Sequence, residues 1–290
     1  MAKQPELVMI AGPNGSGKST LIGGLQASPE LRLPALYVNA DDIQREEGVD
    51  AHQAQQLAQH RRVAALDARK DVMYETVMSH PSKIAELQAA QRAGYHITIH
   101  FVATDDPEIN VERVGLRVDA GGHDVPDDRI RARYARTLAL APVAIGYADQ
   151  ALIFDNTARG ASNDGLQLQV AIDDVRIASS VRDTAKWVQK LTDQYQERAQ
   201  ELGKIASKHP DETFLANLNA ATQGPIVGIG RHYAVQLDEQ TRHYILHDKV
   251  LLGVERFSTL KTSEVYNIQY KEGVASAERT SSREPPDHTR

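Results

Sequence analysis

The sequence predicts an α/β fold, in which a parallel β-sheet flanked by helices is followed by a C-terminal helix and a small β-rich region. Residues 12–19 read Gly-Pro-Asn-Gly-Ser-Gly-Lys-Ser and match the phosphate-binding pattern G-x-x-x-x-G-K-[S/T]. Short apolar runs alternate with helical patterns up to residue 157. Polar residues follow four of these runs, at the strand ends where parallel sheets bind ligands.

The glycine-rich segment lies between an apolar run at residues 7–10, which predicts a buried strand, and residues 19–22, which can begin a helix. Its glycines permit a close backbone approach, so that amide groups can point at phosphate oxygens. A glycine-rich surface turn is the alternative. We expect Lys18 to reach the β- and γ-phosphates of ATP and the Ser19 hydroxyl to bind Mg²⁺. The predicted nucleotide contacts are Gly12, Asn14, Gly15, Ser16, Gly17, Lys18, Ser19 and Thr20.

The next elements follow in the same alternation. Further strands are predicted at residues 35–38, 72–74, 96–102 and 152–154. Helices are predicted at residues 51–70, from Pro81 to Gly94, from Asp106-Pro107 through Val118, and from Pro126 through Leu138. The four polar strand ends are the glycine-rich segment, Asp41/Asp42, Glu75/Thr76 and residues 155–157. Their convergence is a stronger argument for a site than any single residue.

Beyond residue 157 the pattern changes. One more strand is predicted within residues 166–177, and an amphipathic helix with one apolar stripe at 181–206. Residues 224–253 become β-like, and residues 271–290, rich in Ser, Glu, Arg and Pro, are predicted to be disordered. The predicted domains are therefore a nucleotide-binding domain at 1–178, a helical connector at 179–222, a β-rich region at 223–270 and a tail at 271–290.

Composition narrows the class of protein. The 290 residues are 41% hydrophobic and 25% charged, as in an ordinary soluble protein. The net charge of -6 argues against broad binding to nucleic acid or to an anionic membrane. Because the chain has no cysteine, it has neither disulfides nor thiolate metal sites, which fits a cytoplasmic location. The apolar runs are too short to span a bilayer.

Phosphoryl transfer needs a carboxylate that accepts the proton of the attacking hydroxyl. Asp41 is the candidate base and Asp42 its competitor, and either could instead hold Mg²⁺ through water or cap the helix before Ile43. Glu75, Thr76 and Ser79 could bind a polar substrate, although Ser79 could equally cap a helix.

Six arginines lie between residues 113 and 136, and cations are needed to stabilise the charge on a transferring phosphoryl group. Most must be solvated helix residues. Arg117 precedes Gly121 and Gly122, which suits a moving lid. Arg133 and Arg136 share one helix face.

Four stretches of this sequence resemble the zeta-toxin family of P-loop kinases. They are the glycine-rich segment with Pro13-Asn14, Tyr37-Val38-Asn39-Ala40-Asp41, Tyr74-Glu75-Thr76-Val77-Met78-Ser79, and Arg117-Val118-Asp119-Ala120-Gly121-Gly122-His123-Asp124-Val125-Pro126 followed by Arg133-Tyr134-Ala135-Arg136. The last stretch is the most specific, and the resemblance covers roughly residues 5–157.

The resemblance implies transfer of the ATP γ-phosphate to a hydroxyl of a UDP-activated amino sugar, typically UDP-N-acetylglucosamine, which poisons cell-wall synthesis. By position, Asp41 resembles the family's base and Lys18 its phosphate-binding lysine. Glu75 and Thr76 fall in its sugar-nucleotide stretch, and Arg117 resembles a phosphate-contacting arginine. The second such arginine is Arg133, Arg136 or neither. The Glu-Thr-Val-Met-Ser segment departs from the family's Glu-Gly-Thr form, which bears on the acceptor sugar.

The resemblance also implies a small helical antitoxin that obstructs the nucleotide site. Because only eleven residues precede Gly12, we expect it to act in trans, the alternative being the 181–206 helix acting in cis. Residues 224–253 resemble the KfrB-like region of plasmid-encoded proteins, which suggests a mobile element. Two other functions remain open: a kinase for another hydroxylated metabolite or an antibiotic, and a nucleotide-dependent binding or regulatory protein.

Overall fold

The computed structural model of this chain describes residues 3–122, 124–157, 165–174 and 176–280. The chain divides into two compact units, residues 1–195 and residues 196–290. The helix α7 (Lys186–Ala206) crosses the boundary between them, so each half of this helix belongs to a different unit.

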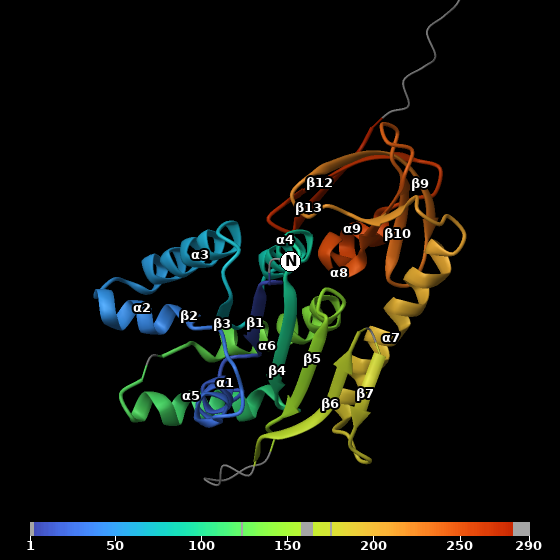
Figure 1. The fold of residues 1–290 in the computed structure, drawn as a ribbon. Helices are drawn as coiled ribbons and strands as arrows, with labels where there is room; N and C mark the ends of the chain where they lie inside the picture. Colours follow the sequence, from blue (N-terminus) through green and yellow to red (C-terminus); the bar gives the residue numbers. More distant parts are fainter. Residues whose placement is uncertain (1–2, 123, 158–164, 175, 281–290) are drawn as a thin grey trace, which may run out of the picture. The chain divides into compact units, whose positions relative to one another are not determined.

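The first unit contains a seven-stranded sheet in the order β2-β3-β1-β4-β5-β6-β7 (Figure 1). The first five strands of that order run parallel, and β6 and β7 are antiparallel additions at one edge. The strands are β1 (Glu6–Ala11), β2 (Leu36–Val38), β3 (Val72–Thr76), β4 (His96–Ala103), β5 (Gln150–Asp155), β6 (Gln167–Asp173) and β7 (Arg176–Ser180). The parallel core fits the expected α/β class, and its inner strands β1 and β4 are almost entirely buried.

Helices flank this sheet. They are α1 (Lys18–Ala27), α2 (Ala40–Glu47), α3 (Ala51–Asp67), α4 (Ser82–Arg92), α5 (Pro107–Asp119) and α6 (Asp127–Ile145). Three of them (α2, α3 and α5) begin at a residue whose side chain caps the helix. Asp106 caps α5 by accepting the amide of Glu108, and Pro107 occupies its first turn, as the sequence predicts. Pro126 likewise precedes α6 directly.

Two expectations for this unit were incomplete. Helix α2 was not predicted as a separate element, because its eight residues are strongly polar and offer one buried side chain, Ile43. The strand expected within residues 166–177 is present as β6, but the turn that follows it and the second strand β7 were not predicted. Asp174 adopts a positive φ of 45° and the chain turns back, so that β6 pairs antiparallel with β7.

The second unit contains a six-stranded sheet in the order β13-β12-β9-β10-β11-β8, antiparallel except for the β11–β8 pair. Its elements after α7 are β8 (Thr213–Leu215), β9 (Ala221–Ile229), β10 (Tyr233–Leu237), β11 (Tyr244–Asp248), α8 (Lys249–Leu252), α9 (Val254–Thr259), β12 (Val265–Lys271) and β13 (Val274–Arg279). Strands therefore begin inside the connector predicted at residues 179–222.

The disordered tail predicted at residues 271–290 is wrong for its first half. Glu272 and Gly273 have φ values of 48° and 76° and link β12 to β13 as a two-residue hairpin turn. Residue 275 is buried beside its partner Tyr270, so β13 contributes to the core. Residues 281–290 of that prediction lie outside the described residues.

A buried polar chain fixes the centre of the second sheet. The amide nitrogen of Gln236 donates to the carbonyls of Gly224 and Tyr266. Its oxygen therefore accepts from Thr222 Oγ1 at 2.7 Å and from His247 Nε2 at 3.0 Å. Burial lowers the pKa of His247 to about 3, so the imidazole is neutral and its Nδ1 accepts from the Tyr270 hydroxyl at 3.1 Å.

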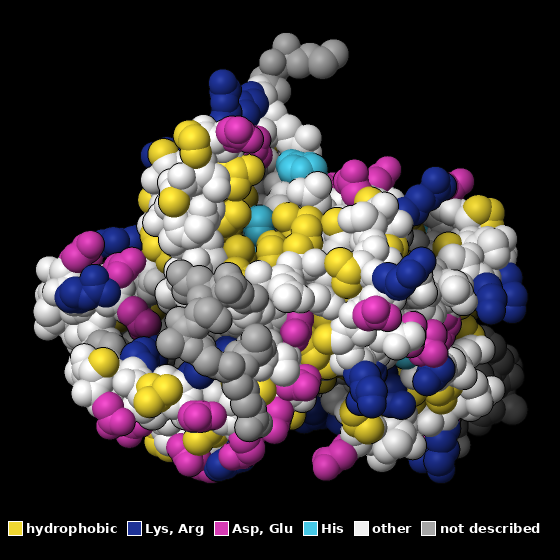
Figure 2. Space-filling model, turned by 90° about the horizontal axis from the view of Figure 1, so that it is seen from below, with side chains coloured by type: hydrophobic (Ala, Val, Ile, Leu, Met, Phe, Trp, Pro, Cys, Tyr) yellow, Lys and Arg dark blue, Asp and Glu magenta, His cyan; other side chains and the backbone are white. Residues whose placement is uncertain are grey.

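The charges on the surface and the apolar character of the helices are relevant to the partners of this chain. The face drawn in Figure 2 intersperses acidic and basic side chains without a large field of one sign. No helix within the described residues has the length and apolar character needed to cross a membrane.

The tight crossing of β9 and β10 generates a prediction. A Cβ at Gly224 would lie 1.9 Å from the Leu237 carbonyl oxygen, so Gly224→Ala should destabilise the second unit by about 1–3 kcal/mol. The matched control is Gly203→Ala in α7, where a Cβ meets nothing within 4 Å and a stabilisation of about 0.5–1 kcal/mol is expected. Chemical denaturation measures both, and equal effects would contradict the assigned crossing.

Candidate functional site

The glycine-rich segment connects the buried strand β1 to helix α1. Gly15 and Gly17 have φ values of 74° and 99°, a left-handed region that only glycine occupies readily. Gly17 is also the N-cap of α1, and no side chain caps the first amides of this helix. Because uncapped amides and the helix dipole attract anions, the loop has the features of a phosphate site.

Neighbouring segments approach the loop backbone so closely that side chains are excluded. A Cβ built at Gly12 would lie 2.0 Å from the Val102 carbonyl oxygen. A Cβ at Gly15 would lie 2.6 Å from the Asn110 carbonyl oxygen, and one at Gly17 would lie 2.2 Å from Asn156 Nδ2. All three glycines of the motif are therefore required by packing as well as by conformation.

Lys18 extends along the loop and is only 6% exposed. Its Nζ donates to the carbonyls of Gly12 and Pro13, both at 2.9 Å, and lies 3.7 Å from Glu75 Oε1. Burial lowers the pKa of Lys18, whereas Glu75 and Asp41 act to raise it and Arg117 acts to lower it. The candidate base Asp41, the candidate substrate-binding residue Glu75 and the guanidinium of Arg117 thus lie within electrostatic range of this ammonium group.

Asn39 connects the ends of β2 and β3 to the start of α2. Its Oδ1 accepts the Asp41 amide at 2.8 Å and so caps the helix. Its Nδ2 donates to the Tyr37 hydroxyl at 2.9 Å and to Glu75 Oε2 at 3.2 Å. Burial raises the pKa of Tyr37 to about 12, which keeps this hydroxyl neutral. One carboxamide therefore fixes the helix turn that carries Asp41 relative to Glu75.

The two adjacent aspartates have different surroundings. Neither is the cap of α2, because Asn39 fills that position. Asp42 Oδ1 forms an ion pair with Arg45 Nη2 at 3.0 Å on the helix surface. Asp41 is exposed, and no hydrogen bond or ion pair of its carboxylate is described.

The stretch after β3 also reaches the loop. The Thr76 carbonyl accepts the Gly12 amide at 3.3 Å, and Thr76 Oγ1 accepts the Met78 amide at 3.0 Å. Ser79 is half-buried and does not cap α4, whose N-cap is Pro81. The capping alternative for Ser79 is therefore wrong.

The arginines separate by position. Arg133 Nη1 lies 3.4 Å from Asn14 Oδ1, so it reaches the loop from α6, whereas Arg136 is exposed and has no described contact with the loop. Burial, followed by Arg129 and Arg136, lowers the pKa of Arg133. Arg117 lies exposed in the last turn of α5.

These residues suit a nucleoside triphosphate with a metal ion. The Ser16 hydroxyl is buried within the loop and has no hydrogen-bond partner among the described residues. Ser19 and Thr20 are exposed in the first turn of α1. The loop thus combines open amides, an ammonium group, hydroxyls and nearby guanidinium groups, which is the donor set that bound phosphates require.

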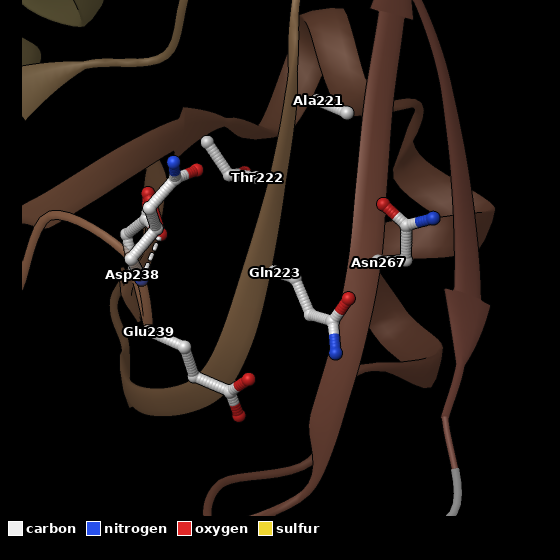
Figure 3. A pocket seen from close by; sticks show the side chains of 7 residues that line it. Ala221, Thr222, Gln223, Asp238, Glu239 and Asn267 are labelled. Carbon is white, nitrogen blue, oxygen red and sulfur yellow. Dashed lines mark hydrogen bonds between the residues drawn. The ribbon is translucent and has the colours of Figure 1, made fainter.

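A separate pocket in the second unit has different chemistry. It has a volume of about 380 Å³ and is lined by Ala221, Thr222, Gln223, Asp238, Glu239, Gln240 and Asn267. In Figure 3, Asp238 and Glu239 lie on one side of β9 and Asn267 on the other. Its lining contains two carboxylates and neither lysine nor arginine, so it does not suit a triphosphate.

Fold and loop together define a P-loop nucleotide-binding protein of the kinase type. Residues 1–143 match the family model described as Zeta toxin, so the N-terminal region of this chain is a zeta-toxin P-loop kinase domain. An uncharacterized protein from Haemophilus influenzae is 27% identical over 146 residues, covering 45% of this chain and 94% of that protein.

The chain was also matched to solved structures. A chain from the PezAT chromosomal toxin–antitoxin system of Streptococcus pneumoniae has a TM-score of 0.43 and 15% identity, over 69% of this chain and 88% of that chain. A chain from the AvrRxo1-ORF1:-ORF2 structure with ATP has a TM-score of 0.47 and 15% identity, over 65% of this chain and 64% of that chain.

Three asparagines at the site had no predicted role. Asn39 had a readable signal, because asparagine before a run of helical residues is a good N-cap. Asn156 follows a strand, within a polar cluster that was noted. Asn110 lies within α5, where it donates to the Asn14 carbonyl at 2.5 Å and accepts from Thr104. Nothing in the local sequence distinguishes Asn110 from any other helical polar residue.

The double role of Asn39 predicts a graded effect of substitution. Asn39→Ala loses both the cap and the bonds to Tyr37 and Glu75, and should lower the free energy of unfolding by about 1–3 kcal/mol. Asn39→Ser keeps a capping oxygen and should recover about half of that loss. Chemical denaturation of both variants measures the difference, and equal losses would show that capping contributes nothing.

Proposed function

We propose that this protein is an ATP-dependent kinase that transfers the γ-phosphate to a hydroxyl of a UDP-activated amino sugar, and that it acts as a toxin. The zeta-toxin match supports a phosphotransferase of this family. One observation carries the assignment within this chain: the buried ammonium of Lys18 lies in the electrostatic field of both Glu75 and Asp41, at the carboxyl ends of neighbouring strands.

The two carboxylates have different surroundings, which supports different roles for them. Glu75 is half-buried, and its oxygens face Lys18 and Asn39. A group held in this way orients its neighbours. Asp41 is exposed on the first turn of α2, where a substrate hydroxyl can reach its carboxylate. We therefore assign Asp41 as the general base and Glu75 to holding Lys18 and the acceptor end of the site.

The proposed reaction has one displacement step. Asp41 accepts the proton of the acceptor hydroxyl while the oxygen of that hydroxyl bonds to the γ-phosphorus. The bond from that phosphorus to the bridging oxygen breaks, and ADP leaves. Lys18 and the loop amides hold the phosphates, and Arg117 and Arg133 stabilise the negative charge that spreads over the transferred group. Thr76 and Ser79 complete the proposed acceptor contacts. Arg136 lies on the surface and is given no role in the proposed reaction.

We propose Ser19 as the protein ligand of Mg²⁺, which would neutralise the phosphate charge when bound. Its place in the first exposed turn of α1, directly after Lys18, supports this assignment. We further propose a small protein antitoxin that acts in trans; the matched PezAT chain comes from a toxin–antitoxin system. A cytoplasmic location fits a UDP-sugar substrate.

A product assay tests the acceptor. Purified protein with ATP and Mg²⁺ should convert a UDP-N-acetylated amino sugar into a species heavier by one phosphoryl group, detected by mass spectrometry, while UDP-glucose should react poorly. Phosphorylation of an aminoglycoside or another metabolite, with no UDP-sugar product, would contradict the acceptor while keeping the kinase. Omission of Mg²⁺ should abolish product.

Three point variants test the residue roles. Lys18→Ala should lose ATP binding, because the phosphate clamp is removed. Asp41→Asn should keep its ATP affinity within about twofold but lower kcat by about 10²-fold or more, because only proton transfer is lost. Asp42→Asn is the matched control and should behave as wild type, since Asp42 pairs with Arg45.

Expression of the same variants tests toxicity. Wild type and Asp42→Asn should arrest growth, and Lys18→Ala and Asp41→Asn should not. Growth arrest by all four chains would contradict a toxicity that depends on phosphoryl transfer.

A further inference from the structure

The residues after β5 stand between the phosphate loop and helix α7. Asn156 donates from Nδ2 to the Ser16 carbonyl at 2.9 Å, and the same nitrogen fills the space that a Cβ at Gly17 would need. Its backbone amide donates to the Ala103 carbonyl at 2.9 Å. Asn156 thus supports the centre of the loop from outside, at two adjacent residues of the motif.

The residues on either side of Asn156 are fixed independently. Asp155 Oδ1 accepts two short hydrogen bonds, from Thr157 Oγ1 at 2.5 Å and from Trp187 Nε1 at 2.6 Å. Thr157 Oγ1 also accepts the Asp105 amide at 3.0 Å. Bonds from both sides therefore restrict the short turn that carries Asn156.

Trp187 begins this chain of contacts and lies in the first turn of α7. Its indole is 9% exposed and packs at a tilt against Phe101, with 6.1 Å between ring centroids. Packing alone would require only an aromatic ring. The Nε1–H adds a directed bond to Asp155, which phenylalanine could not make.

We propose that Trp187 is a positioning residue for the phosphate loop, acting through Asp155 and Asn156. Trp187 holds Asp155, so that Asn156 keeps the Ser16 carbonyl and the Gly17 backbone in place, and the loop amides stay oriented toward a bound phosphate. The inference rests on the proposed nucleotide binding but on neither the acceptor nor the phosphoryl transfer.

Calorimetric titration with ATP, without acceptor, tests the proposal on the full chain. Trp187→Phe keeps the ring and loses the donor, and Asp155→Ala loses the acceptor, so each should bind ATP about threefold to tenfold more weakly. Asp155→Asn keeps an acceptor oxygen and should restore near wild-type affinity. The matched control is Thr192→Val in the same helix, whose hydroxyl bonds within the described residues to the Val188 and Gln189 carbonyls, and it should bind as wild type.

Hydrogen exchange of the nucleotide-free protein supplies a readout that does not depend on catalysis. Amides of residues 12–18 should exchange faster in Trp187→Phe and Asp155→Ala than in wild type or Thr192→Val. Unchanged ATP affinity and unchanged exchange in both variants would overturn the proposal. Loss of kinase activity with normal ATP binding would overturn only the proposed reaction. If wild type binds no nucleotide, the proposed function fails and the exchange result alone decides the positioning role.

The single tryptophan of the chain adds a spectroscopic check. Because its indole is bonded to Asp155, next to Asn156, ATP should change the wild-type emission intensity, and Lys18→Ala should abolish that change. If calorimetry shows that the chain binds ATP but saturating ATP leaves the tryptophan emission unchanged, the result would count against the proposed link between Trp187 and the phosphate loop.

Discussion

Steric exclusion around one loop is the constraint on which the first unit depends. Val102, Asn110 and Asn156 approach the backbone of Gly12, Gly15 and Gly17 more closely than any Cβ would allow. These contacts come from β4, from α5 and from the turn after β5, so three separate elements must be in place before the loop is held. Because a loop fixed in this way has little freedom to lose, its amides can bind phosphate at a low entropic cost.

The sequence was sufficient for the parts of the fold that depend on local chemistry. The glycine motif, the Asp106-Pro107 helix start and the apolar strands are all signalled by neighbouring residues, and the parallel sheet follows from their alternation. Contacts between residues far apart in the chain could not be predicted from the sequence. Asn110 joins the loop 96 residues away through a hydrogen bond that no local pattern indicates. Arg133 and Arg136 are equivalent in sequence, and only the packing of α6 brings one of them to Asn14.

The errors beyond residue 157 have a common physical cause. At Asp174, and again at Glu272 and Gly273, positive φ values reverse the chain between antiparallel strands. The composition of residues 271–290 suggested disorder, yet Glu-Gly between residues that can alternate is also a hairpin signal. In β13, small residues at 275 and 277 face neighbours on β12, so few large apolar side chains are needed. A prediction from hydrophobicity alone therefore misses an edge strand of this kind.

The charge distribution around the loop gives a final argument for an anionic ligand. Arg129, Arg133 and Arg136 are spaced to lie on one face of α6, an arrangement in which like charges repel. Burial and the two neighbouring guanidinium groups lower the pKa of Arg133, which lies against Asn14 of the loop. A chain with a net charge of -6 has many carboxylates that could have relieved this repulsion. A guanidinium group that lies beside uncapped helix amides and is repelled by two neighbours is stabilised most directly by a polyanion, and a triphosphate bound in the loop would supply that charge.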